Sequence, residues 1–174
     1  MLIDLNLLLQ YTDWERQKWH ESLRQQGDQV LKISAGSHAD GRFETVGDLV
    51  RHIFSAEKRY IERLSDQPLT DTASIPTDNI EALFQFSRQS RKAFREFVET
   101  LPDQEWDAPR DYMMANHPLR ATPKKFVIHV LLHEIRHWAQ IATILRQNGL
   151  KGDFHDFLFS PVAGGDARRE RVQK

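Results

Sequence analysis

The 174-residue sequence contains no cysteine. The chain therefore cannot form a disulfide, supply a thiolate ligand to a metal, or use a thiol nucleophile of its own. A metal site in this protein has to be built from imidazole and carboxylate groups, and a thiol substrate has to come from outside. The eight histidines supply ample imidazole for such a site.

A long apolar segment is also missing. The longest strongly apolar stretch, residues 126–132, is interrupted by His129 and is far shorter than the ~20 residues that a membrane helix needs. The N-terminus has neither a basic region nor a small-residue cleavage site, which are the marks of a secretory signal. We therefore expect a cytoplasmic protein with no membrane partner.

Neither sign of charge is in excess, because 24 Lys and Arg residues face 25 Asp and Glu residues, for a formal net charge of −1. Nucleic-acid-binding domains usually carry a basic face or a high isoelectric point. We therefore expect no nucleic-acid partner. The alternative depends only on a basic cluster near the C-terminus, which comprises Arg168, Arg169, Arg171 and Lys174.

The composition, 40% hydrophobic and 28% charged, is typical of a soluble globular protein. The length fits one domain, and a domain near this size buries roughly 70% of the surface of its unfolded chain, which is enough for a core without disulfides. We expect a single domain over residues 1–159 and a flexible tail over residues 160–174.

Apolar residues recur at helical spacing in four segments, whereas no segment shows a clear alternation of apolar and polar residues between turns. This pattern predicts an all-α fold. Four helices with one apolar stripe each bury those stripes most simply by packing as a four-helix bundle. The first expected helix covers residues 4–26, and the second runs from Thr45 to before Pro68. The third runs from Thr77 or Asp78 to before Pro102. The fourth begins at Pro123, with Thr122 as its N-cap, and ends before Gly149.

Two predicted connections are long, residues 27–44 and residues 103–121. The second contains Trp106 and Tyr112 among other large side chains, and we expect it to be an irregular, packed segment that covers a site. Residues 153–159 are expected to form a short segment docked on the bundle. These lengths leave the order of the helices in the bundle open.

The last predicted helix carries a stripe of histidines. At 100° per residue, one narrow face comprises His129, His133, Arg136, His137 and Gln140. Histidines four residues apart are neighbours on a helix, so His133 and His137 can ligate one metal ion together. The alternative is that each imidazole is a core residue hydrogen-bonded to a carbonyl or carboxylate.

Residues 133–137 also fit the pattern HExxH, in which Glu134 would be the general base of a metalloprotease. The Gly and third His that follow in metzincins are replaced here by Gln140 and Thr143, and no predicted strand could hold an extended peptide. A peptidase is therefore disfavoured. Two catalytic candidates are kept, Glu134 as a base and Arg136 as a group that binds a substrate carboxylate, with a buried ion pair as the alternative for Arg136.

A third ligand has to come from another helix, and His52 in the second helix is the best-placed candidate. Glu57 lies near the centre of the apolar stripe of that helix, where a carboxylate needs a partner. Glu57 either orients a ligand imidazole or forms a structural ion pair. The remaining histidines are expected at the surface, namely His20, His38, His117 and His155.

These residues together resemble the DinB/YfiT-like metal-binding four-helix bundles. The resemblance depends on a His followed five positions later by a Glu, His52 and Glu57, and on the pattern His133-x3-His137-x2-Gln140 in the last helix. It implies that His52, His133 and His137 bind a divalent metal ion, reported as nickel, zinc or iron, and that further coordination positions stay open. It also implies that His129 is not a ligand and that the protein forms a homodimer.

Family members often have small residues and Arg-Gly just before the Gln that corresponds to Gln140. This chain has Trp138-Ala139 there, which is expected to make the pocket wall bulkier. The cavity is expected to be lined by Trp106, Tyr112 and Trp138. Three neutral imidazoles leave the metal its full charge, so a bound water or thiol would be acidified. The resulting hypothesis is a metal-dependent S-transferase that uses a low-molecular-weight thiol, or a hydrolase, acting on a small-molecule substrate. The alternative is a non-catalytic, stress-associated metal-binding bundle.

Overall fold

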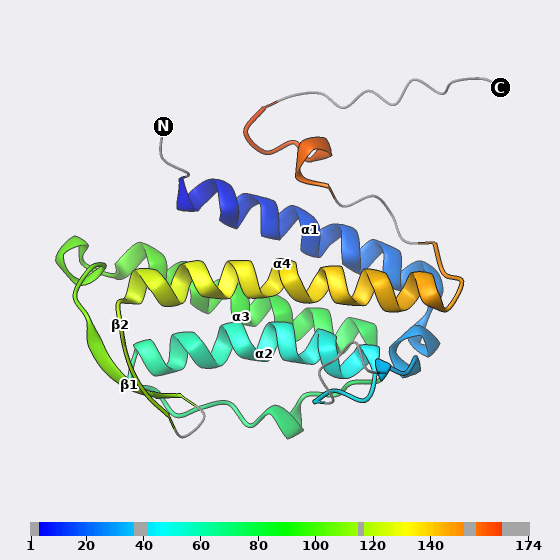
Figure 1. Ribbon diagram of the computed structural model, residues 1–174, viewed down its shortest axis with the longest axis horizontal. Coiled ribbons are helices and arrows are strands. Elements are labelled where there is room, and N and C mark those ends of the chain that lie inside the picture. Colours follow the sequence, from blue (N-terminus) through cyan, green and yellow to red (C-terminus); the bar gives the residue numbers. More distant parts are fainter. Residues whose placement is uncertain (1–3, 37–41, 115–116, 152–155, 165–174) are drawn as a thin grey trace.

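Four helices pack side by side in the computed structural model, which describes residues 4–36, 42–114, 117–151 and 156–164 (Figure 1). The helices are α1 (Leu5–Gln26), α2 (Val46–Leu64), α3 (Ile80–Thr100) and α4 (Pro123–Gln147). Helix α2 packs against α3 and α4, and α1 packs against α4 and α3. The predicted all-α four-helix bundle is confirmed.

The helices begin at side-chain caps. Thr45 and Asp48 form a reciprocal capping box at the start of α2, and Thr122 caps α4, which has proline at its first position. Helix α3 begins slightly later than predicted because Asn79, rather than Thr77 or Asp78, accepts the hydrogen bond from the Ala82 N–H.

The prediction of an irregular segment over residues 103–121 is wrong in part. This connection contains an antiparallel hairpin of β1 (Arg110–Met114) and β2 (His117–Ala121), with Tyr112 opposite Leu119. The hairpin lies at one end of the bundle (Figure 1). The strands are five residues long, and Pro118 breaks the alternation in β2, so the two-residue period was too short to recognise in the sequence.

The core is centred on aromatic side chains from three helices. Trp19 of α1 and Trp138 of α4 stack with ring centroids 4.9 Å apart, and Phe54 of α2 meets Trp138 edge-on at 5.9 Å. A second cluster around Phe126 and Phe94 fills the end of the bundle next to the hairpin. The two clusters fix α2 and α4 against each other, which positions the site described below.

The C-terminal segment packs on the bundle where the structure describes it, in residues 156–164. A short 3-10 helix, η5 (Phe157–Phe159), places Phe157 edge-on against Tyr11 at 5.1 Å, as expected of a docked segment. Ser160 and Val162 are also buried, so the packed part extends past residue 159. The four basic residues of the proposed nucleic-acid cluster, residues 168–174, lie outside the described residues. None of the helices described combines the length and apolar character of a membrane span.

Candidate metal centre

Two helices bring three histidines together. His52 lies on α2, and His133 and His137 lie one turn apart on α4. The Nε2 atom of His133 is 3.0 Å from Nε2 of His52 and 3.0 Å from Nε2 of His137. Nitrogens bound at about 2.0–2.1 Å to one tetrahedral ion lie ~3.3 Å apart, so this group fits a metal ion.

Two of the imidazoles are neutral at physiological pH. Burial and the charges of the neighbouring His137 and His52 together lower the pKa of His133 to about 2. Burial, His137 and Arg42 lower the pKa of His52 to about 4. A neutral imidazole keeps a lone pair, which is the form that binds a metal.

Gln140 sets the orientation of one imidazole. Its Oε1 atom lies 2.5 Å from Nδ1 of His137, one turn earlier on α4. With Nδ1 as the donor, the Nε2 atom of His137 carries its lone pair on the side that faces His133, where a metal ion would bind. The position of Gln140 on the histidine stripe was predicted from its spacing, whereas this contact was not.

An aromatic ring from the first long connection covers the group. Phe43 has its ring centroid 4.5 Å from that of His52 and 6.2 Å from that of His137. Backbone pairing holds this segment in place, because the Ala35 N–H donates to the Glu44 carbonyl over 2.9 Å. Sequence reasoning missed Phe43, since the segment around it has no helical period and its partners are set only by the fold.

The aromatic residues expected to line the cavity lie elsewhere. Trp138 is fully buried against Trp19, so the prediction that it forms a bulky pocket wall is wrong. Its position on α4 directs it to the core, about 100° away from His137. Tyr112 packs against Phe126 with centroids 4.7 Å apart, and Trp106 packs against the second core cluster.

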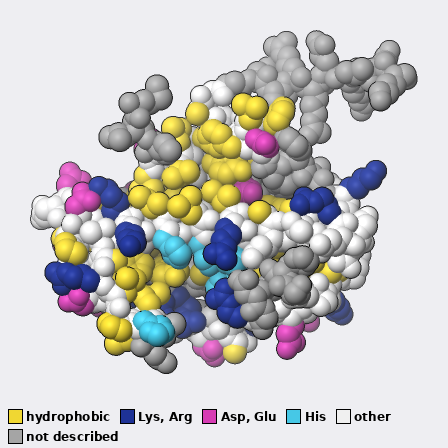
Figure 2. Space-filling model, in the orientation of Figure 1, with side chains coloured by type: hydrophobic (Ala, Val, Ile, Leu, Met, Phe, Trp, Pro, Cys, Tyr) yellow, Lys and Arg dark blue, Asp and Glu magenta, His cyan; other side chains and the backbone are white. Residues whose placement is uncertain are grey.

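Two other members of the α4 stripe lie outside the three-histidine group. His129 is exposed, and its Nε2 atom lies 3.2 Å from the Tyr60 hydroxyl. Arg136 is also exposed, which contradicts the alternative of a buried ion pair, and its charge contributes to the lowered pKa of His133. Figure 2 shows histidine and basic side chains next to each other on this face.

A model of the DinB family matches residues 1–166. The chain belongs to the DinB family. The match includes all four helices and therefore the three histidines. No curated protein matches the sequence. The membership confirms the resemblance seen in the sequence and agrees with the helical bundle.

Glu57 and Glu134 of this DinB-family protein belong to a buried ion network to which all four helices contribute. Arg16 donates to Glu134 over 2.5 and 2.8 Å and to Glu57 over 3.1 and 2.9 Å. Arg91 donates to Glu134 over 2.8 Å, and Ser90 donates to Glu57 over 2.8 Å. The structure therefore places Glu57 in an ion pair, which is one of the two predicted alternatives.

Glu134 lies next to a predicted ligand in sequence but points about 100° away from His133, toward Arg16 and Arg91. Burial alone would raise its pKa, but the charges of Arg16 and Arg91 outweigh burial and lower it. Both carboxylate oxygens are used, since Trp138 Nε1 also donates to Oε1 over 3.2 Å. The carboxylate is thus committed to the network.

The arginines of this network were not predicted, although the sequence contained a signal. Arg91 lies three to four residues from Ser87 and Phe94 on the apolar stripe of α3, and Arg16 holds the same kind of position before Trp19. A charged residue at core spacing predicts a buried partner. Only the packing of the helices identifies that partner.

Glu15, next to this network, leads to a prediction about pH. Burial and the charge of Glu134 together raise its pKa to about 8. The pKa of Glu15 in the folded protein lies above its unfolded value of 4.5. The contribution of Glu15 to the free energy of unfolding is therefore greatest below about pH 4.5 and falls as the pH rises to about 8. We expect Glu15→Gln to stabilise the protein at pH 8 by on the order of 3 kcal/mol and to have little effect at pH 4.5.

Urea unfolding of wild type and Glu15→Gln across this range measures the difference. Glu21→Gln, on the exposed side of α1, is the matched control and should show no such trend. An equal shift in stability at both pH values would contradict the raised pKa of Glu15.

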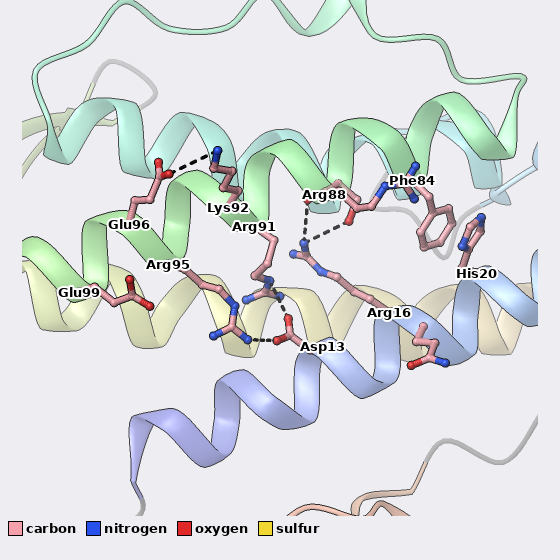
Figure 3. Close-up of a pocket in the computed structure, with 12 residues that line it drawn as sticks. Asp13, Arg16, His20, Phe84, Arg88, Arg91, Lys92, Arg95, Glu96 and Glu99 are labelled. Carbon is pink, nitrogen blue, oxygen red and sulfur yellow. Dashed lines mark hydrogen bonds and ion pairs between the residues drawn. The ribbon is translucent and has the colours of Figure 1, made fainter.

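A separate groove of about 610 Å³ lies between α1 and α3, on the side of the bundle away from the three histidines (Figure 3). Asp13 pairs there with Arg91 and Arg95, and His20 stacks on Phe84 with centroids 4.2 Å apart. The described residues contain no second group of three metal ligands, in this groove or elsewhere. His117 is exposed, as expected, whereas His38 and His155 lie outside the described residues.

Proposed function

We propose that this DinB-family protein binds one divalent metal ion through His52, His133 and His137 and acts as a metal-dependent enzyme on a small-molecule substrate. The observation that carries the proposal is the convergence of three imidazole nitrogens from α2 and α4 within 4.8 Å. Imidazole donors suit nickel, zinc and iron, and availability selects among them.

The same three ligands favour chemistry on a small molecule. A site with three protein ligands keeps coordination positions for a water or substrate, and the bound ion supplies Lewis acidity that lowers the pKa of a water or thiol. The chain contains no cysteine, so a thiol that reacts here is a low-molecular-weight cosubstrate. The proposed reaction class is transfer to or from such a thiol, with hydrolysis as the second candidate.

The surrounding side chains favour the thiol reaction over hydrolysis of the metalloprotease type. Glu134, the general base that HExxH would require, is held by Arg16 and Arg91 inside the bundle. Phe43 places an apolar ring against one side of the imidazole of His52. Arg136 lies exposed on the same stripe and is a candidate to bind a carboxylate of the cosubstrate.

Access to the site distinguishes an enzyme from a non-catalytic metal-binding bundle. His52 and Phe43 form part of the wall of a groove of about 370 Å³ along α2. A groove of this size admits a small molecule to the side of His52. This opening favours the enzyme over the alternative of a structural or stress-associated metal site.

Cobalt(II) substitution tests the proposal without knowledge of the substrate. We expect the full chain to bind one cobalt ion per protein, and we expect added cysteine or glutathione to produce a thiolate-to-cobalt absorption band, because the coordination sphere remains open. Serine is the matched control for cysteine, since it lacks only the thiol. The measurement is a titration followed by ultraviolet and visible absorption.

A cobalt spectrum that does not respond to thiols or to a small anion such as azide would indicate a closed site and would support the non-catalytic alternative. If the protein bound no cobalt, zinc or nickel at stoichiometric level, the proposed metal centre itself would be refuted. A positive response would then justify a transfer assay with several low-molecular-weight thiols.

A further inference from the structure

The groove beside His52 carries an excess of positive charge. It runs along α2, and its walls include Arg51, Arg59 and Arg63. Asp48 is the single carboxylate among the described residues that line it, and Asp48 is paired with Arg51 over 2.9 Å. The other two arginines, Arg59 and Arg63, therefore have no carboxylate in the groove wall to neutralise their charge.

Arg59 and Arg63 lie close together, and the neighbouring carboxylate of Glu62 is bound to Lys58 and Thr70 instead. Arg63 donates to the backbone carbonyl of Arg59 over 3.3 Å, and neither guanidinium forms an ion pair within the part of the chain that the structure describes. The Nε–H of Arg59 is shielded from solvent and has no hydrogen-bond partner there. A buried donor of this kind favours a ligand that supplies an acceptor.

The electrostatics of the pair agree with this geometry. Burial and the positive charge of Arg59 lower the pKa of Arg63, and together they outweigh the opposite effects of Tyr60 and Glu62. An anion between the two guanidinium groups would relieve this repulsion, and planar guanidinium groups match the oxygens of carboxylate and phosphate.

The arginines are aligned with the candidate metal centre. His52, Ala56, Arg59 and Arg63 follow at helical spacing on one side of α2, and all four line the same groove. Because a helix rises about 1.5 Å per residue, the Cα atoms of His52 and Arg59 are roughly 10 Å apart. A ligand that reaches both ends of the groove is elongated.

We propose that Arg59 and Arg63 bind the anionic group, a carboxylate or phosphate, of an elongated organic substrate whose other end lies at His52. This inference rests on the proposed function for the identity of the reacting end, whereas the anion site stands on the arginine groove alone. An adjoining pocket of about 200 Å³ shares Tyr60 and Met114 with the groove and is lined by Phe126 and Leu119. It offers a place for an apolar part of the same substrate.

Isothermal titration calorimetry of the full chain tests the anion site with hexanoate and hexyl phosphate, and with 1-hexanol as the neutral control. We expect both anions to bind and hexanol to bind much more weakly. The stronger of the two anions identifies the acidic group of the substrate. We expect Arg59→Gln and Arg63→Gln each to weaken anion binding by about tenfold or more, because charge-assisted hydrogen bonds are lost.

Arg88→Gln is the matched control for these variants, because it removes the same charge from an exposed arginine in the α1–α3 groove. It should change the affinity by less than about twofold, the effect expected of a distant surface charge. Equal weakening in all three variants, or equal binding of hexanol and the anions, overturns the proposal. If a variant unfolds, the test is the NMR chemical shift of the Arg59 Nε–H in the wild-type protein. Bound hexanoate should change this shift, and an unchanged shift refutes the site.

The same titrations in His133→Ala separate this inference from the proposed function. Anion binding that persists in a variant without bound metal supports the arginine site even if the metal centre has no enzymatic role. A wild-type protein that binds zinc stoichiometrically and binds neither anion refutes the arginine site alone.

Discussion

His133→Ala is expected to abolish stoichiometric metal binding. His133 is the central member of the group, because its Nε2 atom is the one that lies 3.0 Å from both of the other imidazoles. Removing it leaves two imidazoles, and the described residues nearby offer no carboxylate within the group as a replacement. Elemental analysis after zinc loading should fall from about one ion per chain to a trace amount.

His117→Ala is the control for this experiment, since His117 is exposed on β2 and lies outside the group. It should keep the full metal content. We also expect His133→Ala to retain its helical circular dichroism, because His133 is only partly buried and the core packs through other faces of α4. Zinc should raise the melting temperature of the wild type and of His117→Ala but not of His133→Ala.

Unchanged zinc content in His133→Ala would refute the metal centre as described. An intermediate loss of metal affinity is expected for a change at Gln140, whose Oε1 atom contacts Nδ1 of His137. Gln140→Ala should keep the metal but weaken its affinity by roughly 10–100-fold, the usual effect of removing a group that orients a ligand.

The helices could be predicted because their signals are local. Thr45 with Asp48 and Thr122 with Pro123 mark helix starts through contacts within one turn. His133 and His137 were recognised for the same reason, since four residues along a helix place two side chains on one face. His52 is 81 residues away from His133, so its spacing alone gave only weak support for the pairing, and the family resemblance strengthened it.

The features that were missed depend on packing between distant segments. Phe43 reaches His52 because two irregular segments, around Ala35 and Glu44, pair through their backbones. The residues next to Phe43 in the sequence give no sign of this pairing. The hairpin was hidden by its short strands and by Pro118. The sequence around Glu134 suggested a catalytic base, whereas the partners that occupy its carboxylate come from α1 and α3.

The network around Glu134 leads to the largest expected change in stability. Glu134→Ala would leave the buried guanidinium groups of Arg16 and Arg91 with fewer counter-charges, and breaking a buried pair by removing one partner costs about 3–5 kcal/mol. For a protein of this size, the melting temperature should fall by about 10 °C or more. If the alanine variant does not fold, Glu134→Gln keeps the shape of the side chain and serves as the milder test.

The matched control is Glu96→Ala, which removes a glutamate from the exposed side of α3, where it pairs with Lys92 over 3.7 Å. A surface pair of this kind contributes between about 0 and 1 kcal/mol, so the control should unfold nearly as the wild type does. Equal stability of the two variants would show that the network adds little to the fold.

Metal content measured on the same Glu134 variants separates a structural role from a catalytic one. We expect the folded Glu134→Gln protein to bind zinc as the wild type does, and to show the same cobalt response to thiols, because the carboxylate points away from His133 into the network. A variant with unchanged stability but an altered cobalt spectrum would instead place Glu134 at the metal centre. A loss of stability with an intact metal site would establish that the residues of the HExxH pattern in this chain have two separate roles. The histidines belong to the three-histidine group, and the glutamate belongs to the ion network shared by the four helices.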